Sequence, residues 1–167
     1  MSRAFVREGD QEDIPVVAPR AFLPDGVTNY VTSRGWQLLQ QERLELQKEQ
    51  DRLKKQSRED NRVQVNYLAA KLYLLDERIS RTQIIDYKDQ INDQIRFGAT
   101  VTLYKEEEDC YCEYQIVGVD EADIQQNKIS FLSPIAKVLL NRTVGESIIL
   151  NTPKGLRHME IEAINYK

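Results

Sequence analysis

Cysteine and histidine are scarce in this chain of 167 residues, which contains only Cys110, Cys112 and His158. The two cysteines are separated by one residue, with no histidine or third cysteine near them, so they do not make the ligand set of a zinc site. We expect reduced thiols with a structural role. His158 stands in a strand-like run without an acidic or nucleophilic motif around it, and we assign it no catalytic role.

Long apolar runs and an excess of positive charge are also missing. No run reaches the roughly 18 apolar residues of a membrane span, and the first thirty residues mix charged with scattered apolar residues, unlike a secretory signal. The formal net charge is −4, so no global positive charge is present to hold duplex nucleic acid by counterion release. We therefore expect a cytoplasmic monomer, independent of membranes, whose nucleic-acid contacts are local.

With 41% hydrophobic and 30% charged residues, the chain has the composition of a folded protein. Residues 1–31 are nonetheless rich in turn formers and have no sustained helical or strand period, which predicts an extended N-terminal arm. Two interpretations of the arm stay open. In one, its apolar residues lie against the folded body or a partner; in the other, the arm is a partly disordered tail. These apolar residues are Ile14, Val16, Val17, Phe22 and Leu23.

Residues 32–87 carry two apolar stripes at helical spacing, with Thr32 as the expected N-cap. The second stripe has the alternating spacing of four and three that is typical of a coiled-coil seam. Residues 57–62 hold the best turn formers of the region. The pattern predicts an antiparallel coiled-coil hairpin with arms of about 20–25 residues, or roughly 30–37 Å. The stripes are Trp36, Leu39, Leu46 and Leu53, then Leu68, Leu72, Leu75, Ile79 and Thr82.

After a linker at residues 88–97, the period changes to that of short strands, and residues 98–167 are expected to form a small β-rich domain. Strands are predicted over residues 99–104, 111–117, 128–132, 147–150 and 158–165. One short helix is predicted over 134–140, because Pro134 suits a first helical turn and Ser133 suits the cap before it. The predicted fold class is α+β.

Several segments of the C-terminal half resemble the C-terminal domain of the GreA/GreB transcript cleavage factors. In order they are residues 116–123 (IVGVDEAD), 129–130 (IS), 133–137 (SPIAK), 144–146 (VGE) and 151–155 (NTPKG). The likeness covers residues 97–166. Residues 31–35 (VTSRG) and 84–87 (IIDY) also resemble the two ends of the family's hairpin, the second being closer to GreB. The resemblance implies that the β-rich domain is FKBP-like.

This resemblance also implies a partner, bacterial RNA polymerase. In the family, the coiled-coil hairpin enters the secondary channel of the polymerase and the C-terminal domain docks on the rim of that channel. Carried over by residue, the docking surface is the turn and helix start formed by Asp120, Glu121, Ser133, Pro134, Ile135, Ala136 and Lys137. A purely structural turn and helix cap would have the same sequence.

The family's chemistry lies at the hairpin tip, in a pattern close to G-D-x-x-E-N-A-[DE]-Y, where an Asp and a Glu help the polymerase to hold a second magnesium ion. Registering this chain on Tyr67 aligns Asp60 with the catalytic Asp and Glu59 with the Gly, whereas Val63 replaces the catalytic Glu. Asp60 is therefore the candidate for a shared Mg²⁺, with Glu59 as a neighbouring acid, and the protein alone is expected to bind no cofactor. An exposed acidic pair that is merely solvated is the alternative.

The hairpin is also shorter than in the family, by roughly fifteen residues or about two helical turns per arm. A loss of about 11 Å of reach would leave a carboxylate far outside the roughly 2.0–2.1 Å of direct Mg²⁺ coordination. The register on Tyr67 depends on how such a deletion rebuilt the tip. Reach and tip composition therefore favour a regulator that occupies the channel over an efficient stimulator of cleavage.

Positive charge gathers near the same tip, at Lys54, Lys55, Arg58 and Arg62. In the related factors, basic residues of the hairpin face the extruded 3′ end of the transcript, and local charge can attract phosphate even on an acidic chain. The alternative is a solubilising helix face, laced with acidic residues.

Three classes of function follow. The first is a polymerase-binding elongation regulator without an active site of its own, which either competes for the channel or stimulates hydrolysis of backtracked RNA by the polymerase. The second is an FKBP-like prolyl isomerase or chaperone, for which Phe97, Phe131 and the tyrosines are the few candidates to line a proline pocket. The third is a helical-hairpin adaptor for another protein.

Overall fold

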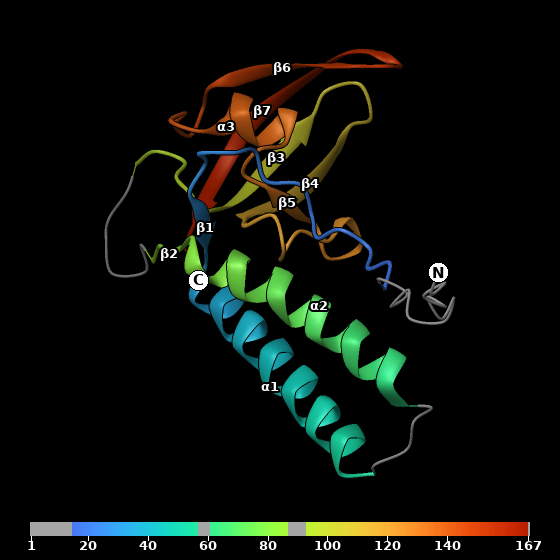
Figure 1. Ribbon diagram of the computed structural model, residues 1–167. Helices are drawn as coiled ribbons and strands as arrows, with labels where there is room; N and C mark the ends of the chain where they lie inside the picture. Colours follow the sequence, from blue (N-terminus) through green and yellow to red (C-terminus); the bar gives the residue numbers. More distant parts are fainter. Residues whose placement is uncertain (1–14, 57–60, 87–92, 167) are drawn as a thin grey trace, which may run out of the picture.

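The computed structural model describes residues 15–56, 61–86 and 93–166. Two helices form a hairpin that projects from a β-rich domain, as Figure 1 shows. The expected mixed α+β class is confirmed. Within the described ranges, no helix is long and apolar enough to cross a membrane.

The hairpin consists of α1 (Ser33–Lys55) and the antiparallel α2 (Arg62–Ser80). Helix α1 begins where predicted, because the Thr32 side chain accepts a hydrogen bond of 2.9 Å from the Gly35 amide. The predicted stripes supply the buried leucines between the helices, namely Leu39, Leu53, Leu68 and Leu75. The expectation that Thr82 continues the second stripe is wrong, since α2 ends at Ser80 and Thr82 lies in a strand. The coiled-coil geometry stays a prediction.

A short parallel pair of strands closes the base of the hairpin. Strand β1 (Asn29–Val31) pairs with β2 (Thr82–Ile84), in the register Asn29↔Thr82. Asn29 is fully buried, and its Nδ2 donates to Thr82 Oγ1 at 3.0 Å. No local pattern in the sequence indicated this pair. It fixes both ends of the hairpin to each other.

The β-rich domain is built on a five-stranded sheet in the order β5-β4-β3-β7-β6. The strands are β3 (Thr100–Lys105), β4 (Cys110–Val117), β5 (Lys128–Ser130), β6 (Ser147–Thr152) and β7 (Gly155–Asn165). All neighbours are antiparallel except β4 and β5. A register shift between Thr102 and Leu103 interrupts the pairing of β3 with β7. Each predicted strand is present, with ends that differ by up to three residues.

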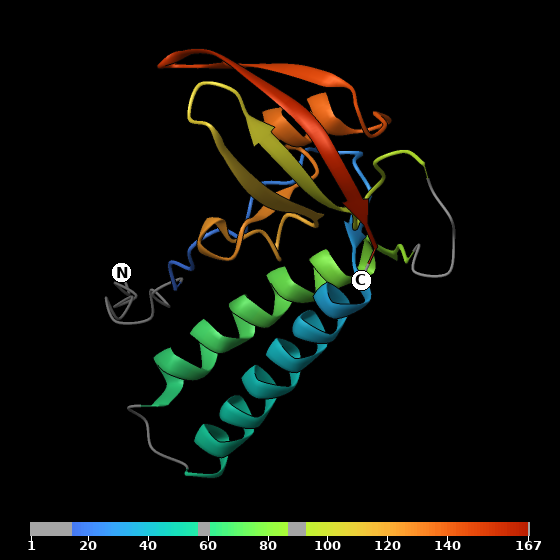
Figure 2. The same ribbon diagram turned by 180° about the vertical axis from the view of Figure 1, so that it is seen from behind.

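The core of this domain lies between the sheet and the short helix α3 (Pro134–Leu139). As predicted, Ser133 caps α3 by accepting from the Ala136 amide, and Pro134 occupies its first turn. Figures 1 and 2 show α3 on one face of the sheet, and no helix of the described residues over the other. Within the segment predicted as a linker, Ile95 and Phe97 are buried in this core.

Candidate functional site

The hairpin tip presents basic side chains on the last turn of α1. Lys54 and Lys55 are both exposed, and Lys54 Nζ donates to Gln50 Oε1 at 2.9 Å. Arg62, also exposed, opens α2. Arg58, Glu59 and Asp60 lie outside the described residues, so their predicted roles are untested.

Two described residues of the tip bear on its chemistry. Asn61 Nδ2 donates to the Leu53 carbonyl at 3.2 Å, which ties the start of α2 to the end of α1. Val63 is 63% exposed, so the tip presents an apolar side chain to solvent there; its register with the family's catalytic Glu stays a prediction. Among the residues with described coordinates, no group of three or more His, Cys, Asp or Glu side chains could hold a metal ion.

At the other end of the hairpin, Asp120 joins three parts of the molecule. Its carboxylate lies 3.2 Å from the Arg20 guanidinium and 3.4 Å from that of Arg78, and its side chain is only 10% exposed. Arg20 also forms a bidentate pair with Glu42 of α1, at 2.9 and 3.0 Å. The hydrogen bond to Glu42 raises the pKa of Arg20, whereas burial lowers that of Arg78.

Glu121 is buried beside Asp120 and faces the start of α1. Its Oε2 accepts from Thr32 Oγ1 at 2.6 Å, and Lys128 Nζ lies 3.6 Å from its Oε1. A Cβ atom on Gly35 would lie 2.6 Å from Glu121 Oε2, so a larger residue at this position would have to displace the Glu121 carboxylate. Both acids of the predicted docking turn therefore point into the junction between hairpin and sheet.

The other predicted docking residues begin α3, and they divide into two groups. Pro134 and Lys137 are exposed, while Ala136 is buried and Ile135 is half-buried against the core. Ser133 serves as the helix cap. A partner at this helix would meet Pro134 and Lys137 first; the docking role itself stays a prediction.

Sequence reasoning missed the arginines that hold the N-terminal segment. Arg20 stands in a stretch without any period, and its partners Glu42 and Asp120 are 22 and 100 residues away, so no local pattern indicated them. Of the arm's described apolar residues, Val17 and Leu23 are half-buried while Val16 and Phe22 are exposed, so both interpretations of the arm stay open. Residues 17–21 of the arm, with Lys71 and Leu74 of α2 and with Asp120, line a hollow of about 260 Å³.

The aromatic residues considered for a proline pocket pack against one another. Tyr30 of β1 lies 6.1 Å from Phe97 and 5.6 Å from Phe131, measured between ring centroids, and the two phenylalanines are 5.8 Å apart. Such tilted and edge-on contacts stabilise a core. This cluster seals the base of the hairpin to the sheet domain, and it gives the prolyl isomerase alternative no support.

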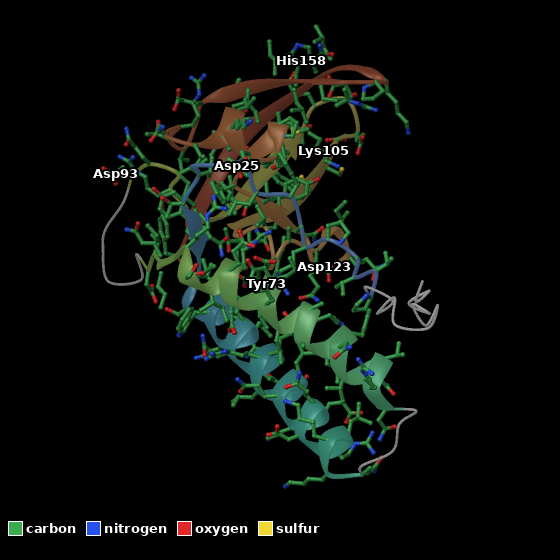
Figure 3. All side chains as sticks on the ribbon, viewed as in Figure 1. Asp25, Tyr73, Asp93, Lys105, Asp123 and His158 are labelled. Carbon is green, nitrogen blue, oxygen red and sulfur yellow. The ribbon has the colours of Figure 1, made fainter. Side chains whose placement is uncertain are left out.

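Among the described residues, the two cysteines and the single histidine are not part of a metal-binding cluster. Cys110 and Cys112 are free thiols, and burial raises the pKa of Cys112. His158 Nδ1 lies 3.0 Å from Glu107 Oε1. Figure 3 places His158 at the end of the sheet domain that lies away from the hairpin helices α1 and α2.

Known proteins match the C-terminal part of the chain through a family model. Residues 90–166 match the family "Transcription elongation factor, GreA/GreB, C-term". Transcription elongation factor GreA of Maricaulis maris is 37% identical over 100 residues, which cover 60% of this chain and 64% of that protein. GreA of Francisella philomiragia is 45% identical over 94 residues, covering 56% and 59%. The matches thus span about three-fifths of the length of these relatives.

Solved structures resemble the chain over a longer span but at low identity. GreA factor homolog 1 (Gfh1) of Thermus thermophilus is 24% identical, covering 83% of this chain and 99% of that one, with a TM-score of 0.40. GreA/GreB from Nitrosomonas europaea is 18% identical, covering 84% and 99%, with a TM-score of 0.42.

Proposed function

We propose that this chain, which carries a GreA/GreB C-terminal domain, is a transcription elongation regulator that binds bacterial RNA polymerase. The sheet domain docks at the rim of the secondary channel and the hairpin enters it. The observation that carries the proposal is the family match over residues 90–166, directly behind an antiparallel helical hairpin. The protein acts on the polymerase and has no active site of its own.

The surface of the hairpin suits a deep channel filled with water. Its buried residues form a narrow seam, while the flanks carry ion pairs such as Arg43–Asp76 at 2.7 Å and Arg52–Glu49 at 2.6 Å. Polar flanks remain hydrated and add little to stability. A hairpin of this kind has small affinity for its own copies and fits a polar channel wall.

Tip composition and length support occupation of the channel rather than stimulation of cleavage. Helix α1 has 23 residues and α2 has 19, about 34 and 28 Å at 1.5 Å per residue. With Val63 in place of a carboxylate, Asp60 and Glu59 are the acids left to reach a polymerase-bound Mg²⁺. The exposed Lys54 and Lys55 would face the extruded 3′ end of the transcript and attract its phosphates.

A binding and cleavage assay on stalled, backtracked elongation complexes tests the proposal. We expect wild-type protein to bind the polymerase, to give little magnesium-dependent RNA cleavage, and to displace a cleavage-competent factor. Asp60→Ala should leave binding nearly unchanged, because it removes no docking contact. Robust cleavage that collapses in Asp60→Ala or Glu59→Ala would instead establish an active cleavage factor. Absence of binding would overturn the proposal.

A further inference from the structure

The segment of residues 15–28, here called the strap, contacts the hairpin and the sheet domain at once. Arg20 is its central residue, since its guanidinium donates to Glu42 of α1 through both terminal nitrogens and to Asp120 of the sheet domain through Nε. Only 19% of the Arg20 side chain and 10% of the Asp120 side chain are exposed. Arg20 thus bridges two parts of the molecule at a mostly buried position.

Two arginines at the end of α2 hold the backbone of the strap. Arg78 donates to the Ala21 carbonyl and also pairs with Asp120. Arg81 donates to the carbonyls of Pro24 and Val27, at 3.3 and 3.2 Å. The strap is therefore fastened to α1, α2 and the sheet domain by charged hydrogen bonds, which are stronger than neutral ones.

Among the described residues, other connections between the hairpin and the sheet domain lie close to β1 and β2. They include the hydrogen bond from Thr32 to Glu121, the contacts of Tyr30 with the two phenylalanines, the packing of Ile85 against the sheet-domain core, and the approach of β1 to Gly118. Contacts gathered at one point fix a position but leave the hairpin free to swing about it. Glu42 lies more than two turns along α1, so the pair Arg20–Glu42 acts on the hairpin at a distance from that point.

We propose that the strap sets the direction in which the hairpin projects from the sheet domain, with Arg20 as the positioning residue. The consequence for polymerase rests on the proposed function: a hairpin that enters a channel while its sheet domain docks outside must already point the right way. A strap that holds this direction raises the fraction of molecules competent to bind, and apparent affinity follows that fraction.

Distances between spin labels in the protein alone test the strap directly. Cys110 and Cys112 are replaced by serine, and labelled cysteines are introduced at the exposed positions of Lys48 on α1 and Asn151 on β6. We expect a single narrow distance distribution for the wild-type strap, a clearly broader or shifted one for Arg20→Ala, and an intermediate one for Arg20→Lys. The matched control is Arg34→Ala, an exposed arginine in the first turn of α1, which should leave the distribution unchanged.

The positioning role of the strap is overturned if the distance distribution of Arg20→Ala superimposes on that of the wild type. Circular dichroism establishes that each variant is folded. If Arg20→Ala does not fold, Glu42→Ala decides, because it removes only the carboxylate partner on α1 and should also broaden the distribution.

Polymerase binding supplies a second and separable readout. If one molecule in ten keeps the binding direction, Arg20→Ala should bind about tenfold more weakly than the wild type, while Arg34→Ala binds equally well. Equal affinity of Arg20→Ala and wild type would contradict the positioning role in binding. If neither the wild type nor Arg20→Ala binds the polymerase, the proposed function fails. The distances between the labels still support or reject the positioning role of the strap.

Discussion

The two halves of the molecule are held together in different ways. The sheet domain has a continuous core to which β3, β4, β7 and α3 all contribute fully buried residues, including Val101, Leu103, Ile116, Leu139 and Ile161. The hairpin buries a single line of leucines, of which Leu39 and Leu75 join Val31 in a small cluster at its base. A narrow seam stabilises less than a closed core, so the hairpin depends on its base and on the strap for stability and direction.

A charged residue at a buried position between the two hairpin helices should cause the largest loss of hairpin stability. Leu75 is fully buried, so Leu75→Asp is expected to destabilise the hairpin by about 3 kcal/mol or more. The helical circular dichroism signal should fall while NMR signals of the sheet domain persist. Leu72 is only half-buried, and Leu72→Asp is the matched variant with a smaller loss. An unchanged helical signal and melting curve for Leu75→Asp would show that Leu75 is not part of a buried seam between α1 and α2.

A cavity in the sheet domain should affect the molecule differently. Leu103 is fully buried, and Leu103→Ala is expected to cost about 2–5 kcal/mol. Chemical denaturation monitored by NMR should show loss of the sheet domain at lower denaturant. Because Tyr30 packs on that domain, the hairpin base should loosen with it. Hairpin signals that outlast the sheet domain would contradict this dependence.

Between the two regions, Gly118 allows β1 to approach the sheet domain. A Cβ atom there would lie 2.5 Å from the Tyr30 carbonyl oxygen, a backbone atom that has little room to move. Gly118→Ala should therefore lower the free energy of unfolding by about 1–3 kcal/mol. Thermal unfolding measures this, with Ala122→Ser at an exposed position of the same turn as control. Equal stability of the two variants would show that β1 can shift without cost.

The smallest effect concerns reactivity rather than stability. Because burial raises the pKa of Cys112, little of its thiol is the reactive thiolate near neutral pH. In the Cys110→Ser variant we expect slow alkylation of Cys112 that accelerates only as the pH rises above the ordinary thiol pKa. Full alkylation at the rate of a free thiol at neutral pH would indicate that this end of the sheet domain opens readily.

Local patterns predicted the elements that depend on local chemistry. The cap at Thr32, the start of α3 at Pro134 and the strands of the sheet domain follow from capping, proline geometry and period. The parallel pair β1–β2 was missed because each strand has three residues and its partner lies about fifty residues away. Such short segments have no measurable period.

The candidate site was predictable only in part, for the same reason. The resemblance indicated Asp120 and Glu121, but their orientation depends on Arg20, Arg78 and Thr32, which meet them only in the fold. Fully or mostly buried acids need partners, and the sequence does not name partners a hundred residues away. The tip acids Glu59 and Asp60 remain predictions from the resemblance.

Crosslinking from the transcript is the sharpest test of the proposed entry of the hairpin tip into the polymerase secondary channel. A photoreactive nucleotide at the 3′ end of the RNA in a backtracked elongation complex would report which part of the chain lies beside it. If the tip enters the channel, crosslinks should be confined to the tip around Lys54, Lys55 and Val63 and should form without substantial RNA cleavage. Crosslinks to the sheet domain, or none while the protein is bound to the polymerase, would contradict it.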